Sequence, residues 1–305
     1  MEIRDGDARY AAAVKLLPLR WQRPALRLPE EQRAAAEEFR LRAGQMLTVL
    51  AEDRELELEA EGGPLTPGEL EQMCDRLTGY SRYAASETLR SGYLAAEGGF
   101  RVGVCGTAVV SGGVNTNLRS ISSLAVRIGC QRPGIAREVA AGLYGGGALP
   151  SVLIVSAPGL GKTTLLRDMI RLLSDGAEGI PPRRVSVADE RGGIAVMQQG
   201  RPQMDVGRHT DVMDGCPKAI AIPMLLRSCN PQVIAVDEIT VREDLTAISA
   251  AAHCGVALLA TIHAADTREL LAKPLFRQLL EMEVFSSCVV IRRQGSDRSY
   301  SVETL

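Results

Sequence analysis

One segment restricts the fold of this chain more than any other: a glycine-rich turn that joins an apolar run to an amphipathic stretch. The run Val152–Val155 is short and continuously apolar, and Thr163–Leu173 carries its large apolar residues on one helical stripe. Between them, residues 156–163 read SAPGLGKT. This matches the phosphate-binding loop pattern G-x-x-x-x-G-K-[ST] except at the first position, where Ser156 replaces glycine. A strand before the turn and a helix after it favour a nucleotide phosphate site over a chance match.

The residues of this loop have separate expected roles. Gly159 and Gly161 allow backbone N–H groups to curl around phosphate oxygens, and the helix that begins near Lys162 adds the positive end of its dipole. We expect Lys162 to reach the β- and γ-phosphates and Thr163 to coordinate Mg²⁺, so the predicted cofactors are ATP and Mg²⁺. The predicted nucleotide-binding set is Ser156, Ala157, Pro158, Gly159, Leu160, Gly161, Lys162, Thr163 and Thr164.

Further apolar runs follow the loop at intervals. They lie at Val185–Ala188, Val233–Val236, Val256–Thr261 and Val289–Ile291. Continuous apolar runs of this length are typical of strands buried on both faces, as in parallel sheets covered by helices. The second half is therefore predicted to be an α/β, RecA-like P-loop domain with a mostly parallel sheet.

A cluster of glycines divides the chain. Residues 142–150 read GLYGGGALP, a composition typical of a linker. We therefore expect a smaller mixed α/β domain over residues 1–141, a linker over 142–150 and the P-loop ATPase domain over 151–305. In the first half, periodicity predicts two strands around Gly44, helices, and a long pair of strands. The ranges are Glu37–Val49 for the first two strands, Leu70–Leu77 and Ala84–Tyr93 for helices, and Phe100–Val110 and Ile121–Ile128 for the long strands.

Two carboxylates follow one of the apolar runs directly. Asp237 and Glu238 end the strand Val233–Val236. Asp237 is predicted to hold Mg²⁺ through water, as a Walker B acid does, and Glu238 to orient or deprotonate the attacking water. The alternative is that these carboxylates only cap the helix after the strand.

A second acidic pair and a histidine end two further strands at the same predicted sheet edge. Asp189 and Glu190 follow Val185–Ala188, and His263 follows the run that ends at Thr261. Glu190 is a second candidate for the catalytic base, and spacing does not decide between it and Glu238. Arg191, next in the chain, is a candidate contact for phosphate or for a neighbouring subunit. The alternative is that these acidic residues and Arg191 form an ordinary surface ion pair. His263 is a candidate sensor of the γ-phosphate, although a lone histidine is often structural.

Composition disfavours a protein that coats nucleic acid. The net charge is -2 and aromatic residues make up 4% of the chain, so a broad basic face and stacking platforms are both scarce. No nucleic-acid partner is expected. The basic stretches Pro181–Arg184 and Arg292–Arg293 nevertheless leave a nucleic-acid-dependent RecA-like ATPase as the alternative function.

Cysteine usage and hydropathy suggest a location. The seven cysteines are widely spaced and form no CxxC pair, which is typical of free thiols in a reducing compartment. No zinc site is expected at His209 or His253. The sequence has neither a signal peptide pattern nor about 18 consecutive apolar residues. We therefore expect a cytoplasmic protein that would reach a membrane only through partners.

Motifs along most of the chain resemble those of the stage III sporulation AA proteins, a family within the secretion ATPase superfamily of type II and type IV systems. They are FRLRAGQ from Phe39, GGFRVGVCGTAVVSGGV from Gly98, ISSLAVRI from Ile121, APGLGKTTLLRDMIRLLS from Ala157, VADERGGIA from Val187, DVMDGCPK from Asp211, VIAVDEIT from Val233 and GVALLATIHA from Gly255. The last motif resembles the His box, with His263 in the histidine position. Asp189 and Glu190 fall where those enzymes carry their acidic Asp box.

The resemblance implies a function and an assembly. It implies a cytoplasmic mother-cell ATPase that powers or assembles a secretion-like channel to the forespore in endospore formation, peripheral at the membrane facing the forespore. It also implies membrane channel proteins as partners and a homo-oligomeric ring, a hexamer, with ATP between subunits. An arginine of the first domain would then reach a neighbour's γ-phosphate, with Arg101, Arg119 and Arg127 as candidates.

The sequence departs from the family pattern in two places. Ser156 replaces the first glycine of the loop, and Arg191 is followed by two glycines and Ile194 where the family has DERSEIA. The glycines weaken any contact that a Ser-Glu pair would provide.

Overall fold

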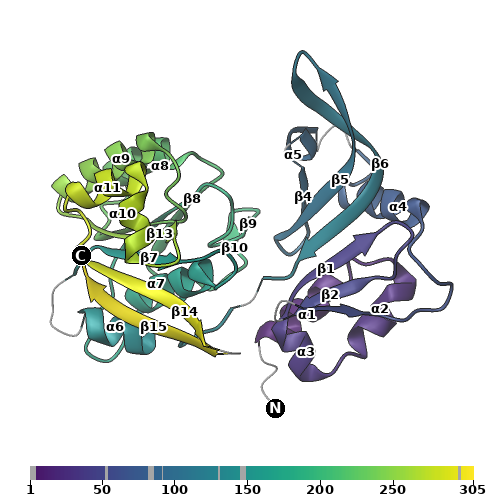
Figure 1. The fold of residues 1–305 in the computed structure, drawn as a ribbon, viewed down its shortest axis with the longest axis horizontal. Helices are drawn as coiled ribbons and strands as arrows, with labels where there is room; N and C mark the ends of the chain where they lie inside the picture. The colour runs from purple at the N-terminus through teal and green to yellow at the C-terminus, as the bar shows by residue number, and fades with distance from the viewer. Residues whose placement is uncertain are drawn as a thin grey trace. The chain divides into compact units, whose positions relative to one another are not determined.

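The chain folds into two compact units, residues 1–131 and 132–305 (Figure 1). The computed structural model describes residues 5–51, 54–81, 86–90, 92–129, 131–144, 149–294 and 297–305. Among the helices in these ranges, none has both the length and the apolar composition that a membrane crossing requires. Each unit has its own buried core, so each is described separately.

The first unit is built around a six-stranded antiparallel sheet with the order β3-β2-β1-β6-β5-β4. The strands are β1 (Ala36–Arg42), β2 (Thr48–Ala51), β3 (Arg54–Glu57), β4 (Tyr93–Ala96), β5 (Phe100–Ser111) and β6 (Val114–Arg127). The helices are α1 (Asp5–Val14), α2 (Leu19–Leu26), α3 (Glu30–Ala35), α4 (Pro67–Leu77) and α5 (Ser86–Arg90). Aromatic residues anchor the core: Tyr10 of α1 packs on Phe39 of β1 with ring centroids 5.1 Å apart, and Trp21 of α2 is fully buried.

Most strands expected in the first unit are present. The strands around Gly44 are β1 and β2, and the long pair of strands is β5 and β6. The expected helix over Ala84–Tyr93 was only partly right, because α5 covers Ser86–Arg90 and Tyr93 already begins β4. Residues 82–85 and 91 lie outside the described ranges. The three helices before β1 were not predicted.

The second unit contains a seven-stranded sheet with the order β11-β8-β12-β13-β7-β14-β15. Every neighbouring pair is parallel except β14 and β15, which form an antiparallel hairpin at one edge. The strands are β7 (Val152–Ser156), β8 (Val185–Asp189), β11 (Thr210–Asp214), β12 (Val233–Val236), β13 (Ala257–His263), β14 (Ser287–Gln294) and β15 (Asp297–Thr304), with a small separate hairpin of β9 (Met197–Gln198) and β10 (Arg201–Pro202). The predicted fold class is confirmed: a mostly parallel α/β unit follows a smaller mixed unit.

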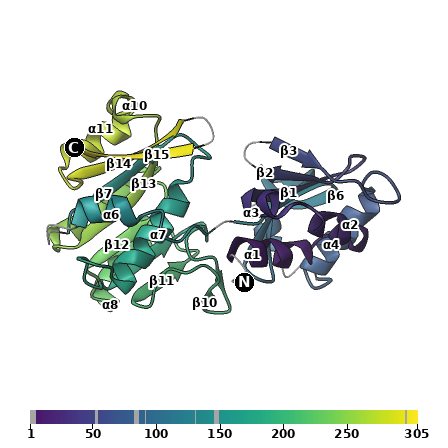
Figure 2. The same ribbon diagram turned by 90° about the horizontal axis from the view of Figure 1, so that it is seen from below.

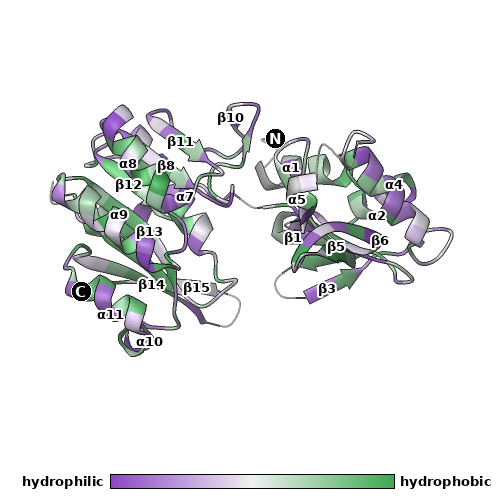
Figure 3. Cartoon of the chain, turned by 90° about the horizontal axis from the view of Figure 1, so that it is seen from above, coloured by the Kyte–Doolittle hydropathy of each residue, from purple (hydrophilic) through white to green (hydrophobic). Residues whose placement is uncertain are grey.

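Helices cover both faces of this sheet. They are α6 (Arg137–Tyr144), α7 (Lys162–Asp175), α8 (Lys218–Ser228), α9 (Arg242–His253), α10 (Thr267–Ala272) and α11 (Pro274–Glu281). Side chains alternate along β7, so that Val152 and Ile154 join the core beneath α6 and α7, whereas Leu153 and Val155 join the core beneath α8 and α9. Figure 2 shows α6 and α7 against one face of the sheet, and Figure 3 shows the apolar character of strands such as β8 and β12.

The boundary between the two units lies earlier than the predicted linker. Residues 132–144 belong to the second unit, where Ala136 and Tyr144 are buried in the core that includes α7. The carboxylate of Asp168 in α7 accepts hydrogen bonds from the backbone N–H groups of Gly134 and Ala136, each at 2.8 Å. The expected domain start at residue 151 was therefore wrong, because glycine content suggested a linker where side-chain packing continues. Residues 145–148 of the expected linker lie outside the described ranges.

The segment that leads into the edge strand β11 is tied to the C-terminal end of α7. The backbone N–H groups of Arg208 and His209 donate to Asp175 Oδ1 at 2.8 Å and to Ser174 Oγ at 2.7 Å. Gly207 has φ +83°, and a Cβ at this position would lie 2.5 Å from Ser174 Cβ and 2.9 Å from Arg171 O. The approach therefore requires both a left-handed backbone and the absence of a side chain.

Gly207→Ala tests this close approach, and Gly200→Ala is its matched control. Gly200 also has a left-handed backbone, φ +75°, but a Cβ there would have no neighbour within 4 Å. We expect Gly200→Ala to cost about 1 kcal/mol through backbone strain alone, and Gly207→Ala to cost at least about 2 kcal/mol more because packed atoms must move. Urea denaturation midpoints measure the difference. Equal midpoints for the two variants would contradict the proposed steric constraint.

Candidate nucleotide-binding site

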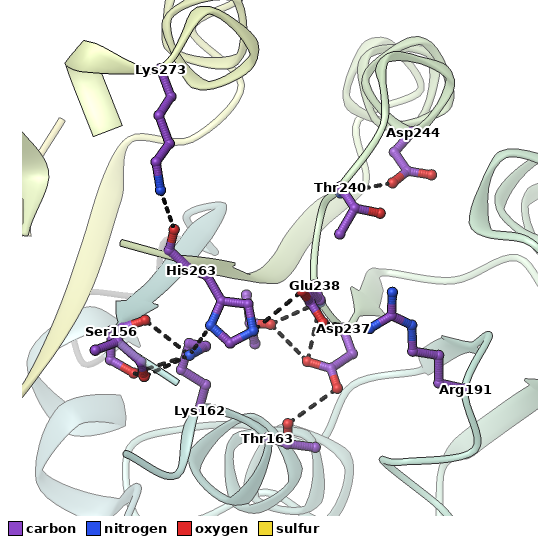
Figure 4. A network of polar contacts seen from close by, with 12 residues as sticks. Ser156, Lys162, Thr163, Arg191, Asp237, Glu238, Thr240, Asp244, His263 and Lys273 are labelled. Atoms are coloured by element: carbon purple, nitrogen blue, oxygen red, sulfur yellow. Dashed lines mark hydrogen bonds and ion pairs between the residues drawn. The ribbon is translucent and has the colours of Figure 1, made fainter. Parts of the chain in front are cut away.

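Four parallel strands end at one edge of the second unit and place the predicted site residues together. His263 of β13 pairs in register with Ser156 of β7, and β12 runs beside β13 and ends one residue before Asp237. Figure 4 shows Lys162, Asp237, Glu238 and His263 converging at this edge. The carboxyl edge of a parallel sheet is the usual place for ligands in this architecture.

The P-loop has the backbone shape that a phosphate requires. Gly159 and Gly161 both adopt left-handed conformations, with φ of +79° and +91°. Gly161 caps α7 without any side-chain hydrogen bond, so no capping side chain covers the N–H groups of the helix's first turn. The P-loop therefore presents N–H groups and the positive end of the α7 dipole to an anion, and these features fit a nucleotide phosphate.

Lys162 is buried and contacts mainly the loop itself. Its Nζ donates to the carbonyl oxygens of Ser156 at 2.9 Å and Ala157 at 3.0 Å, and to Nδ1 of His263 at 2.8 Å. Burial lowers the pKa of Lys162 to about 8, although the charges of Asp237 and Glu238 act in the opposite direction. Among the described residues no carboxylate lies within ion-pair distance of Nζ. A phosphate would supply the opposite charge that this cation lacks.

Ser156 fits into the loop despite replacing the expected glycine. Its side chain is buried; Oγ donates to the carbonyl of Ala157 at 2.9 Å and accepts from Lys162 Nζ at 3.2 Å. The hydroxyl therefore adds one more oxygen to those that surround the ammonium group.

Thr163 and Asp237 lie next to each other, as expected of a magnesium site. Thr163 Oγ1 donates to Asp237 Oδ2 at 3.1 Å, and Thr261 Oγ1 donates to Asp237 Oδ1 at 2.7 Å. A hydroxyl and a carboxylate are the hard oxygen ligands that Mg²⁺ prefers. A Cβ on Gly193 would lie 3.7 Å from Asp237 Oδ2, so bare backbone borders this side of the carboxylate. The donor set therefore fits Mg²⁺.

Glu238 is held in an unusual backbone conformation. Its φ is +37°, a left-handed value that costs a non-glycine residue about 1–3 kcal/mol. Its N–H donates to Thr261 Oγ1 at 2.8 Å, and its carboxylate lies between His263 Nε2 at 3.2 Å and Arg191 Nη1 at 2.7 Å. These contacts fix the direction of the carboxylate, which Figure 4 shows beside His263.

His263 links the P-loop to Glu238. Nδ1 accepts the hydrogen bond from Lys162, so the ring proton resides on Nε2, the nitrogen that faces Glu238 Oε1. A neutral imidazole in this tautomer connects the cation that is predicted to bind phosphate with the carboxylate predicted to act on water.

The second acidic pair is engaged elsewhere. Asp189 is fully buried, and its carboxylate accepts N–H groups of residues 193, 194 and 195 at 2.8, 3.0 and 2.8 Å. Burial raises the pKa of Asp189, and the three hydrogen bonds oppose that shift. Glu190 forms an ion pair with the buried Lys218, whose Nζ is also 3.8 Å from Asp244. Asp189 therefore shapes the loop that borders Asp237, while Glu190 connects β8 to the helices α8 and α9.

Several contributors were missed or left open by sequence reasoning. Thr261 supports both Asp237 and the backbone of Glu238, and strand alternation could have found it because it lies two residues before His263 on the same face. Arg191 forms an ion pair with Glu238, a partner that motif spacing did not identify. Lys218 lies in a motif that gave no sign of its burial.

The arginines expected to act across subunits lie on the long strands of the first unit. Arg101 and Arg127 face each other in register across β5 and β6, and Arg101 stacks over the ring of Tyr93 at 3.8 Å. Arg119 lies further along β6, paired with Thr107. That one of the three acts across subunits stays a prediction.

Solved structures of similar fold include an ATPase and a pilus retraction motor. The ATPase DotB of Legionella pneumophila aligns with a TM-score of 0.58 and 19% identity, covering 88% of this chain and 76% of that one. The pilus retraction motor PilT, solved with bound ADP, aligns with a TM-score of 0.56 and 17% identity, covering 90% and 81%. At these identities the likeness establishes the fold.

Sequence comparisons establish the family. Stage III sporulation protein AA of Bacillus subtilis (strain 168) is 34% identical over 279 residues, which make up 92% of this chain and 90% of that protein. The family model described as sporulation stage III, protein AA matches residues 14–300. This chain therefore belongs to the sporulation stage III, protein AA family, as the motif resemblance indicated.

Proposed function

We propose that this protein is a Mg²⁺-dependent ATPase that works as a ring, a hexamer, to power or assemble a secretion-like channel between mother cell and forespore. The observation that carries the proposal is the buried ammonium of Lys162, which is linked through His263 to the carboxylate of Glu238. Membership of a sporulation family supports the cellular setting, and the likeness to DotB and PilT supports the use of a nucleotide.

The chain's own groups divide the chemistry between them. The loop N–H groups and Lys162 bind the phosphates of ATP, and Lys162 exchanges its carbonyl contacts for phosphate oxygens. Thr163 and Asp237 would hold Mg²⁺, which would supply neutralisation of phosphate charge when bound. Glu238 orients a water molecule and accepts its proton. His263 keeps its contact with Glu238 when Lys162 turns to phosphate, so it reports occupancy of the loop to the catalytic carboxylate.

The setting that we propose is the mother-cell cytoplasm, at the membrane that faces the forespore. Channel proteins in that membrane would be the partners. A ring places the nucleotide between subunits, where Arg101, Arg119 or Arg127 of one subunit would contact the γ-phosphate of the next.

Nucleotide affinity is expected to depend on pH through Lys162. Only the protonated amine attracts phosphate, and its pKa is lowered to about 8. The affinity for ADP should therefore be steady below pH 8 and fall as the pH rises through 8, by up to about tenfold per pH unit. Isothermal titration calorimetry between pH 6.5 and 9.5 measures this fall.

Two variants complete that experiment. Lys162→Arg keeps its charge at every pH tested, so it should bind ADP more weakly but without the fall above pH 8. Lys162→Ala should lose most of the affinity. A fall of the same size in Lys162→Arg would show that another group titrates.

Glu238→Gln should separate ATP binding from hydrolysis. The amide keeps the size of the side chain but accepts no proton, so turnover should drop by roughly 10²–10⁴-fold while the affinity for MgATP stays near the wild-type value. Glu190→Gln is the matched control, because Glu190 pairs with Lys218. Phosphate release and calorimetry on both variants measure the two properties. A comparable loss of turnover in Glu190→Gln alone would assign the base to β8.

Assembly into a ring should make ATP turnover depend on protein concentration. If an arginine of one subunit completes the site of the next, the rate per subunit should rise steeply with concentration and level off once rings form. Phosphate release measured alongside light-scattering mass would show both changes together. A constant rate per subunit would contradict the shared site.

Strong stimulation of ATP turnover by DNA or RNA would favour the alternative function, a nucleic-acid-dependent RecA-like ATPase.

A further inference from the structure

The C-terminal hairpin reaches beyond the strand that carries the P-loop. β14 pairs with β7 only as far as Val290, which lies opposite Val155. Residues 291–294 of β14 continue past that point, and β15 pairs with them in antiparallel register. At roughly 3.3 Å per residue, these four residues extend about 13 Å past the level of Val155.

One side chain of this extension lies close to Gly161 of the P-loop. Arg298 of β15 is half-buried, and its Nη1 and Cζ lie 3.1 and 3.5 Å from the point where a Cβ on Gly161 would stand. Within the described part of the chain, the Arg298 side chain has neither a hydrogen bond nor a carboxylate partner. A planar guanidinium with unused donors therefore lies against Gly161, the N-cap of α7.

The strand order decides which part of a nucleotide this guanidinium would face. Asp237 and Glu238 follow β12, and His263 is the last residue of β13. Both strands lie on one side of β7, whereas β14 and β15 lie on the other side. The first three residues mark the end of the site where the γ-phosphate and Mg²⁺ belong. Arg298 thus approaches from the opposite end, where the α-phosphate and the nucleoside would lie.

We propose that Arg298 binds the α-phosphate of the nucleotide held by the P-loop. The inference rests on the proposed nucleotide site and adds to it a contact from outside the recognised motifs. A guanidinium forms charge-assisted hydrogen bonds to phosphate oxygens, and here it has no competing carboxylate. Because ATP and ADP share the α-phosphate, Arg298 contributes equally to both.

Calorimetric titration of the full chain with MgATP and MgADP tests the assignment. Arg298→Ala should weaken both nucleotides by about tenfold, and Arg298→Lys should recover part of the loss. Arg293→Ala is the matched control, since Arg293 is exposed and lies opposite Arg298 in the hairpin register. It should bind like the wild type. Thermal unfolding of each variant checks that the hairpin remains folded.

The two diastereomers of ADPαS identify the group that Arg298 contacts. Wild-type protein should prefer one diastereomer, and Arg298→Ala should lose that preference. Wild-type affinity in Arg298→Ala, a loss for ATP but not for ADP, or an unchanged preference between diastereomers would each overturn the proposal. Failure of the wild-type protein to bind any nucleotide would instead overturn the proposed function.

Discussion

The candidate site depends on one unfavourable burial, that of the Lys162 ammonium. The protein surrounds this cation with carbonyl oxygens and an imidazole rather than with a carboxylate. Oxygen dipoles compensate only part of the lost hydration, which is why the pKa of Lys162 falls to about 8. A carboxylate partner would stabilise the charge further but would compete with phosphate. The ammonium group therefore remains able to attract an anion. The surrounding strands hold the carbonyl oxygens and the imidazole in place around it.

Coupling between the loop and the catalytic carboxylate follows from strand register. His263 lies opposite Ser156 because β13 and β7 are parallel neighbours, and its two ring nitrogens then face Lys162 and Glu238. Thr261, two residues earlier, supports Asp237 from the same strand. One strand therefore supports both the residue proposed to bind metal and the residue proposed to activate water.

The sequence predicted those parts of the site that are local in the chain. The P-loop shape and the positions of Asp237 and Glu238 follow from strand, turn and helix patterns over a few residues. Long-range pairing was out of reach: nothing near Arg191 indicated its ion pair with Glu238. The edge strands β11 and β15 were missed because one face of an edge is solvated, so their residues are polar and lack a continuous apolar run.

The tie between Asp168 and residues 134–136 decides how the two units can be separated. A fragment that starts at the glycine-rich segment would leave the Asp168 carboxylate without its two backbone donors and would uncover the apolar face of α7 that α6 protects. Such a fragment would expose an apolar patch, and exposed apolar patches promote aggregation. Dissection of the chain for separate study of its halves should therefore cut near residue 131, where the sequence offers no obvious linker.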